Sequence, residues 1–95
     1  MKTKNGLITY PDGTKVWYLN DQLHREDGPA VEYPDGSELW WFNDKFHRKD
    51  GHAIERTDGS KEYWYEGKPY DKISYYNLMV KLGHMTEEEA FLELI

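Results

Sequence analysis

Residues 8–30 read ITYPDGTKVWYLNDQLHREDGPA, and residues 31–53 read VEYPDGSELWWFNDKFHRKDGHA. The two stretches align without a gap, and 12 of their 23 positions are identical. A third, eroded copy starts at Ile54 as IERTDGSKEYWYEGKPYD and loses the motif after Tyr70. A fixed period in the twenties is typical of one supersecondary unit stacked several times into an elongated surface. Such surfaces usually bind other molecules, so the repeat argues against an enzyme.

Each copy carries two turn signals separated by strand-forming residues. The first is Pro-Asp-Gly with Thr or Ser, at 11–14 and 34–37, echoed at 57–60. Its proline presets φ and its glycine takes the positive φ that closes a hairpin. The second is Asn-Asp at 20–21 and 43–44 and Glu-Gly at 66–67. With Val, Ile, Tyr, Trp and Leu around them, these signals predict an antiparallel meander with strands near residues 7–10, 15–19, 29–33, 38–42, 53–56 and 61–65, and short extended pieces around 23–25 and 46–48.

The chain changes character at Asp71, and we expect two helices after it. Asp71 or Ser74 caps a first helix that runs to Leu82, and its apolar face is Tyr75, Leu78, Met79 and Leu82. Thr86 forms a capping box with Glu89 at the start of a second helix. The predicted fold is mostly β: a domain of three stacked hairpin repeats (residues 1–70, with repeats at 8–30, 31–53 and 54–70) closed by a helical cap (residues 71–95).

Composition narrows the possible functions. The 95 residues allow one small domain, and the absence of cysteine removes disulfides and thiolate chemistry. Aromatic residues make up 16% of the chain, so it should fold rather than stay disordered. The net charge is −6 without a basic stripe, which disfavours direct binding of nucleic acid or of an anionic membrane. No signal peptide or membrane span is expected from the sequence. An acidic surface suits a basic protein partner, although it also serves solubility alone.

The order of these motifs resembles the MORN repeat (membrane occupation and recognition nexus). The matching residues in the first copy are Tyr10-Pro11-Asp12-Gly13, Trp17-Tyr18-Leu19-Asn20-Asp21 and His24-Arg25-Glu26-Asp27-Gly28, and the same order runs through Trp40–Ala53. The chain departs from the family where His-Arg-x-Asp-Gly replaces a His-Gly-x-Gly step. This variant is similar to MORN-like proteins of large bacteriophages, other viruses and some bacteria. The resemblance covers residues 6–70 and implies stacked hairpins that scaffold, dimerise or bind partners.

The repeated His-Arg-x-Asp-Gly motif is the best candidate for chemistry. A His and an Asp three residues apart can act as a general base and the carboxylate that orients it, or they can bind a metal. An enzyme seldom needs its active motif twice, and two histidines lack a third metal ligand, so we expect a structural turn with no cofactor, no metal and no catalytic residue. Its members are His24, Arg25, Asp27 and Gly28 in the first copy and His47, Arg48, Asp50 and Gly51 in the second. We expect the two Asp to accept backbone N–H bonds, the two Arg to pair with these or neighbouring acids, and the two Gly to adopt positive φ.

Two columns of aromatic residues recur at the same period. Trp17, Trp40 and Tyr63 occupy equivalent positions, and so do Tyr18, Trp41 and Trp64. Because adjacent strand residues point to opposite faces, the columns lie on opposite faces of the sheet. A single sheet this short cannot bury both, so we expect one column to remain available to a partner. The alternative is that the helical cap covers that face.

The sequence therefore predicts a non-enzymatic protein–protein interaction module that binds through one of these columns. The phage resemblance implies an inhibitor or adaptor that acts on a bacterial host protein in the cytoplasm, which is the host cytoplasm if a phage encodes the chain. Three alternatives stay open: a self-assembling homo-oligomer with no other partner, an acidic mimic of nucleic acid, and a metal- or phosphate-dependent enzyme that uses the repeated motif.

Overall fold

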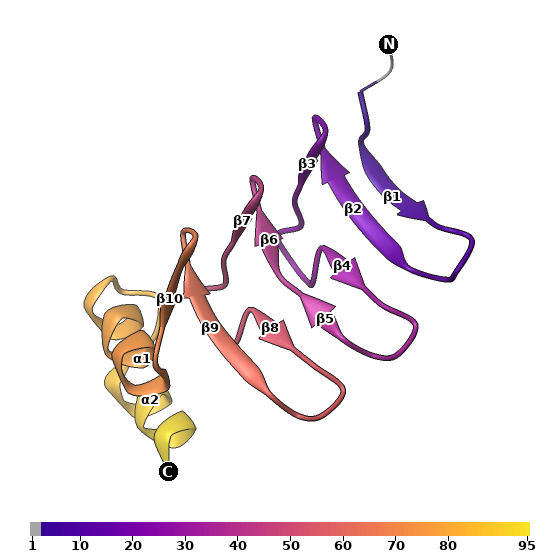
Figure 1. The fold of residues 1–95 in the computed structure, drawn as a ribbon. Coiled ribbons are helices and arrows are strands. Elements are labelled where there is room, and N and C mark those ends of the chain that lie inside the picture. The colour runs from indigo at the N-terminus through magenta and orange to yellow at the C-terminus, as the bar shows by residue number, and fades with distance from the viewer. Residues whose placement is uncertain (1–2) are drawn as a thin grey trace.

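A computed structural model of the chain describes residues 3–95. They form an elongated body of 45 × 28 × 18 Å, in which a row of β-hairpins leads to a pair of helices (Figure 1). The strands are β1 (Gly6–Thr9), β2 (Lys15–Leu19), β3 (Gln22–Leu23), β4 (Val31–Glu32), β5 (Glu38–Leu39), β6 (Trp41–Phe42), β7 (Lys45–Phe46), β8 (Ile54–Glu55), β9 (Lys61–Tyr65) and β10 (Lys68–Tyr70). The helices are α1 (Lys72–Lys81) and α2 (Glu87–Leu94).

The strands form the antiparallel meander that the turn signals predict. In the main sheet β1, β2, β4, β5, β8, β9 and β10 lie side by side in chain order, β3 pairs with β2, and β6 and β7 form a separate hairpin. The expected extended pieces near 23–25 and 46–48 are β3 and β7, each starting one residue earlier. The expected strand at 38–42 is interrupted at Trp40, which separates β5 from β6.

Both turn signals are confirmed by backbone geometry. In the Pro-Asp-Gly turns the aspartate Oδ1 accepts the N–H of the residue two positions later at 2.9 Å, and the glycine has positive φ. In the second turns both central residues have positive φ, at 48° and 66° for Asn20 and Asp21 and at 49° and 63° for Asn43 and Asp44. Two successive positive φ values define the type I′ hairpin turn, whose twist matches that of paired strands.

Trp40, where the expected strand is interrupted, and Trp17, within the continuous strand β2, make equivalent backbone hydrogen bonds. The Trp17 carbonyl accepts the His24 N–H at 3.1 Å, and the Trp17 N–H donates to the Ala30 carbonyl at 2.8 Å. At Trp40 the partners are the His47 N–H, at 3.2 Å, and the Ala53 carbonyl, at 2.6 Å. Each tryptophan is therefore a branch point, because the chain leaves the sheet beside its carbonyl and returns beside its N–H. Residues 24–29 and 47–52 form the excursions between these points.

The two helices begin as predicted, and the expected apolar face of α1 is buried except at its last residue, Leu82. The Asp71 carboxylate accepts the Ser74 N–H at 2.8 Å and caps α1, and Thr86 and Glu89 form the capping box of α2. The expected apolar face of α1 ended at Leu82, which is 46% exposed. Tyr75 and Met79 are buried as expected and Leu78 packs beside them, whereas the buried Tyr76 was not expected. With Ala90 of α2 these residues pack against Tyr63, Tyr65 and Tyr70 of β9 and β10. The helix turns its two adjacent tyrosines toward the sheet because β9 offers them aromatic partners.

The hydroxyl group of Tyr75 ties α1 to the excursion at residues 47–52. It donates a hydrogen bond to the Arg48 carbonyl and accepts one from the Gly51 N–H at 3.2 Å. Tyr75 is fully buried, and burial raises its pKa to about 12, so the phenol stays protonated and able to donate. The helices are thus joined to the sheet by directed hydrogen bonds as well as by packing.

We predict that Tyr75→Phe lowers the free energy of unfolding by about 1–3 kcal/mol, because it leaves a buried carbonyl and a buried N–H unpaired. Urea denaturation followed by circular dichroism measures this. Tyr33→Phe is the matched control, because Tyr33 is 43% exposed and its loss should cost less than about 0.5 kcal/mol. Equal effects of the two substitutions would show that the hydroxyl bridge adds nothing.

Candidate interaction surfaces

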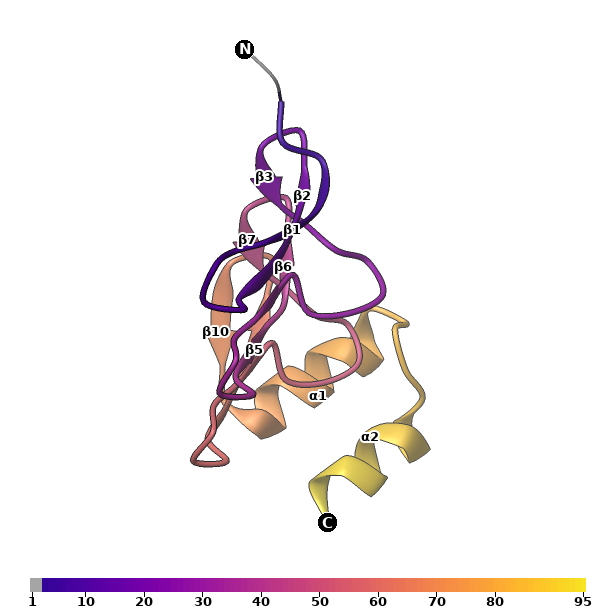
Figure 2. The ribbon, with the colours of Figure 1, turned by 90° about the vertical axis from the view of Figure 1, so that its right-hand side faces the viewer.

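The sheet has two unlike faces. Residues 24–29 and 47–52 project from the same side of the sheet on which α1 and α2 lie (Figure 2). We call this side the loop face and the two excursions loop 1 and loop 2. The other side, which carries the column Tyr18, Trp41 and Trp64, is the open face. A binding site on this molecule has to be sought separately on each.

Arginine organises each loop by lying on the tryptophan of its own branch point. The Arg25 guanidinium carbon is 3.9 Å from the ring centre of Trp17, and that of Arg48 is 3.8 Å from Trp40. Arg25 also donates from Nε to Asp27 at 3.3 Å and from Nη1 to the Pro29 carbonyl at 3.1 Å. Arg48 repeats these contacts with Asp50 at 2.7 Å and with the His52 carbonyl at 3.0 Å. The predicted arginine–aspartate pairing is confirmed in both copies.

Two other expectations for this motif are wrong. Gly28 and Gly51 do not have positive φ; a Cβ on Gly28 would lie 2.7 Å from the Arg25 guanidinium carbon, and one on Gly51 would lie 3.4 Å from that of Arg48. Glycine makes room for the stacked arginine there rather than relieving a strained backbone. Asp27 and Asp50 accept hydrogen bonds from arginine side chains. Backbone N–H groups donate instead to the aspartates of the Pro-Asp-Gly turns.

The two histidines of the motif connect successive turns. His24 Nδ1 accepts the Asn43 N–H at 3.2 Å, and His47 Nδ1 accepts the Glu66 N–H at 2.9 Å. A nitrogen that accepts is unprotonated, and burial lowers the pKa of His47. Neither histidine orients or is oriented by the aspartate three residues later. Within residues 3–95 no group of three or more His, Cys, Asp or Glu side chains is placed to hold a metal ion.

The first aromatic column lies on the loop face, where other side chains cover it. Arg25 lies over Trp17 and Arg48 over Trp40, while the Tyr63 ring centre is 5.1 Å from that of Tyr75. Every member is only partly exposed. The structure thus places the cap over the last member of this column and the two loops over the others.

The second column lies on the open face and is interleaved with residues of the short return strands. Phe46 lies between Trp41 and Trp64, with ring centres 3.9 and 5.1 Å apart. The indole N–H of Trp41 is buried and has no hydrogen-bond partner in the described part of the chain. The resulting aromatic row is covered by neither helix and by neither loop.

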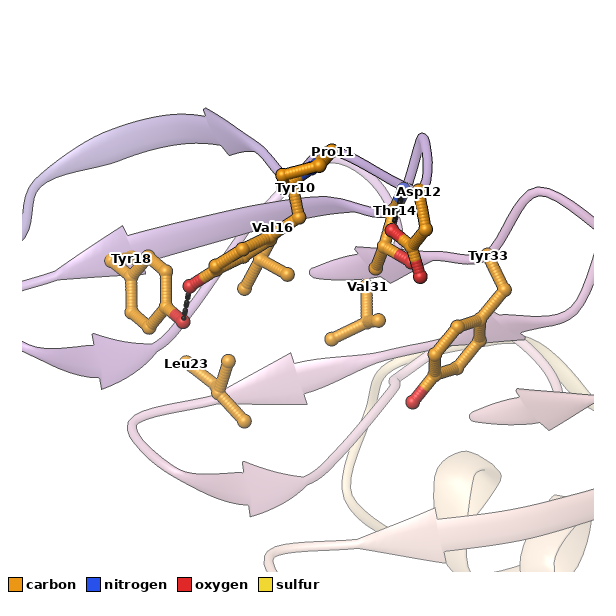
Figure 3. Close-up of a pocket in the computed structure, with 9 residues that line it drawn as sticks. All are labelled: Tyr10, Pro11, Asp12, Thr14, Val16, Tyr18, Leu23, Val31 and Tyr33. Atoms are coloured by element: carbon orange, nitrogen blue, oxygen red, sulfur yellow. Dashed lines mark hydrogen bonds between the residues drawn. The ribbon is translucent and has the colours of Figure 1, made fainter.

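A cup at the N-terminal end of the open face extends this row (Figure 3). It has a volume of about 530 Å³ and is lined by Tyr10, Pro11, Asp12, Thr14, Val16, Tyr18, Leu23, Val31 and Tyr33. The hydroxyls of Tyr10 and Tyr18 are hydrogen-bonded at 2.9 Å, and this bond, with some burial, raises the pKa of Tyr18 to about 12. Tyr33 stands on the opposite side of the cup from this pair. Tyr10 and Tyr33 were not predicted as site residues. The signal that could have identified them is their repetition at the start of each Tyr-Pro-Asp-Gly turn.

Comparison with known proteins adds little. No family model matches the chain, and no solved structure does. A stretch of 24 residues, 24% of the chain, is 62% identical to the uncharacterized protein L111 of Acanthamoeba polyphaga mimivirus. The chain spans only 6% of that protein's length. Across residues 3–95 no helix is both long enough and apolar enough to cross a membrane.

We predict that Arg48→Lys lowers the free energy of unfolding by about 1–2 kcal/mol, because lysine cannot stack on Trp40 and hold both hydrogen bonds of the guanidinium. Thermal denaturation followed by tryptophan fluorescence measures the loss. Arg56→Lys serves as the control, since Arg56 is half exposed and makes a surface ion pair with Glu62. A loss at Arg56 as large as that at Arg48 would contradict the role assigned to the stack.

We also predict that acid destabilises the fold. The pKa values of His47 and His52 are lowered by burial, so the unfolded chain takes up protons more readily than the folded one. The stability they contribute is therefore complete above about pH 6.5 and is lost as the pH falls below it. The melting temperature should be lower at pH 5.5 than at pH 7.5. His47→Asn, whose Oδ1 accepts at either pH, should show a smaller drop, and an unchanged drop would exclude His47 as a source.

Proposed function

We propose that the chain is a non-enzymatic protein-interaction module, built from three stacked MORN-like units, that binds a partner protein through its open face. The observation that carries this proposal is the partly exposed aromatic row of Tyr18, Trp41 and Trp64, on the face without helices or loops, beside the tyrosine-walled cup. Tyrosine and tryptophan are enriched at the energetic centres of protein interfaces, since they bury large areas at low entropic cost.

The rim of the open face indicates the chemistry of the partner. Asp12 stands at the edge of the cup, and the next hairpin forms a similar hollow of about 520 Å³ edged by Asp35 and Asp58. Hydrogen bonds from Thr14 and Ser60 hold the pKa values of Asp12 and Asp58 below the usual range, so these carboxylates are charged at neutral pH. A partner with an apolar anchor flanked by lysine or arginine fits such a face.

We propose that the chain is a phage-type inhibitor or adaptor that acts on a bacterial host protein in the cytoplasm. The bacterial host follows from the resemblance to phage repeat proteins, and the 24-residue match to an uncharacterized mimivirus protein supports only a viral setting. In each loop the aspartate accepts a hydrogen bond from arginine and the histidine accepts one from a backbone N–H, so the motif gives an enzymatic role no comparable support.

Self-association is the second candidate, and the free edge of β1 favours it. β1 is the first strand of the sheet and pairs only with β2 within the described residues. Leu7 in this strand is 50% exposed. Two chains could join through β1 about a two-fold axis. Light scattering tests this, and a mass of one chain at micromolar concentration would exclude it.

The open face is tested by capture from a bacterial lysate with variants on either side of the molecule. We predict that Tyr33→Ala and Trp64→Ala each reduce recovery of a stoichiometric partner at least roughly tenfold, because each removes an aromatic anchor. Phe91→Ala is the matched control, since Phe91 is 60% exposed but lies on α2. Circular dichroism confirms that each variant folds. Loss with Phe91→Ala but not with the other two would contradict the proposal.

A further inference from the structure

The cup and the hollow of about 520 Å³ beside it, which we call the second hollow, lie at equivalent places in successive repeats. Val16 and Val31 line the cup, and Leu39 lines the second hollow. These three residues lie directly opposite one another on the neighbouring strands β2, β4 and β5, so their side chains point to the same face. Tyr33 lines both hollows and is a wall that they share. The open face therefore carries two adjoining hollows in a line across the strands.

The spacing of the two hollows follows from the sheet. Val16 in β2 and Leu39 in β5 are equivalent residues of successive repeats, and only β4 lies between their strands. Neighbouring strands are about 4.7–4.9 Å apart, so equivalent points of the two hollows are about 9.5 Å apart. A ligand that fills both hollows with like side chains has to repeat at this distance.

Among the regular peptide conformations, the polyproline II helix matches this repeat most closely. It rises about 3.1 Å per residue with three residues per turn, so residues i and i+3 lie on one side about 9.3 Å apart. In a β-strand, residues i and i+3 point to opposite sides, and residues i and i+2 are only about 6.6 Å apart. In an α-helix, residues i and i+7 are about 10.5 Å apart, which is the next closest match.

The side chains of the cup suit the same conformation. Tyr10 and Tyr18 stand on one side and Tyr33 on the other (Figure 3), and grooves lined by aromatic side chains are the usual binding sites of polyproline II segments. The hydrogen bond between the Tyr10 and Tyr18 hydroxyls uses one of their two O–H groups, so the other is left to donate. The carbonyls of a polyproline II segment have no partner within the segment and can accept it.

Charge adds a second requirement for the ligand. Asp12 edges the cup, and Asp35 and Asp58 edge the second hollow. The second hollow also contains Arg56, but the guanidinium of this residue is already paired with Glu62. None of the described residues that line the cup is basic. The three carboxylates therefore favour lysine or arginine beside the apolar residues of the ligand.

We propose that the two hollows bind a proline-rich segment of the partner protein in the polyproline II conformation, with residues i and i+3 in successive hollows and lysine or arginine next to them. This inference rests on the proposed function, because it names the chemistry of the segment that the open face binds. Such a segment crosses the strands instead of adding a strand to the sheet. It also costs little entropy to order, since its free conformation is already close to the bound one.

The proposal is tested on the native chain with octaproline carrying a lysine at each end, titrated by nuclear magnetic resonance. The comparison peptide has the same length and charge, with alternating glycine and serine in place of the prolines. We expect the proline peptide to shift the methyl signals of Val16, Val31 and Leu39 saturably and to bind at least roughly tenfold more tightly. The methyl signal of Ala90, packed between the helices and the sheet, is the internal control and should not shift. Equal binding of the two peptides, or unchanged methyl signals in the hollows, would overturn the proposal.

Two peptides of identical composition test the spacing. In acetyl-Lys-Ala-Pro-Ala-Ala-Pro-Ala-Lys-amide the prolines are three residues apart, and in acetyl-Lys-Pro-Ala-Ala-Ala-Pro-Ala-Lys-amide they are four apart. The first should bind at least roughly fivefold more tightly, because only this peptide presents both prolines on the side that faces the hollows. Equal affinities, or no binding of either peptide, would contradict the match between the repeat of the sheet and that of the ligand.

Variants separate this inference from the proposed function. Tyr33→Ala removes the shared wall and should weaken octaproline binding at least roughly tenfold, whereas Ile73→Ala, at a position on α1 that is 63% exposed, should not change it. An unchanged affinity in Tyr33→Ala would contradict binding in the hollows. If Tyr33→Ala and Trp64→Ala lose the captured partner but the native chain does not bind octaproline, the proposed function stands and this inference is wrong. If both variants still capture the partner, the proposed function is wrong whatever the peptides do.

Discussion

The arginine that lies on each branch-point tryptophan is the contact on which the sheet depends. The carbonyl of Trp17 or Trp40 bonds to the residue at which the chain leaves the sheet, and its N–H bonds to the residue at which the chain returns. Such an excursion of six residues would be loose without a constraint. The guanidinium supplies it, since it stacks on the ring and donates to an aspartate and to a carbonyl of the same loop. The arginine therefore holds the conformation of its own loop, while His24 and His47 link successive turns.

This arrangement gives the two faces their different roles. On the loop face the arginines cover Trp17 and Trp40, and α1 covers Tyr63, so the first aromatic column serves the fold. On the open face the second column has only its own neighbours, such as Phe46 between two tryptophans. A thin sheet with one face closed by its own loops and helices leaves the other face for the partner protein that we propose.

Much of the fold could be predicted because its turns are local. Asn20-Asp21 and Asn43-Asp44 tolerate the two positive φ values of a hairpin turn, and each Pro-Asp-Gly signal carries its own hydrogen bond. The capping residues Asp71 and Thr86 act within one helical turn, so they too were visible. What failed depends on distant contacts. Gly28 is required by the position of a stacked arginine rather than by its own φ, and Leu82 stays exposed because β9 receives the paired tyrosines of α1. In the candidate site, strand alternation was enough to predict the two columns. It could not predict that arginines and α1 would cover the first column and leave the second to its own neighbours.

Hydroxyl-radical footprinting of the chain alone and in its captured complex would show whether a partner covers the open face. If it does, Tyr10 and Tyr33, at the cup, are labelled in the free chain and protected in the complex, while Phe91 on α2 is labelled equally in both. Protection of Phe91 with unchanged labelling of the two tyrosines would place the partner on the helices and contradict the account.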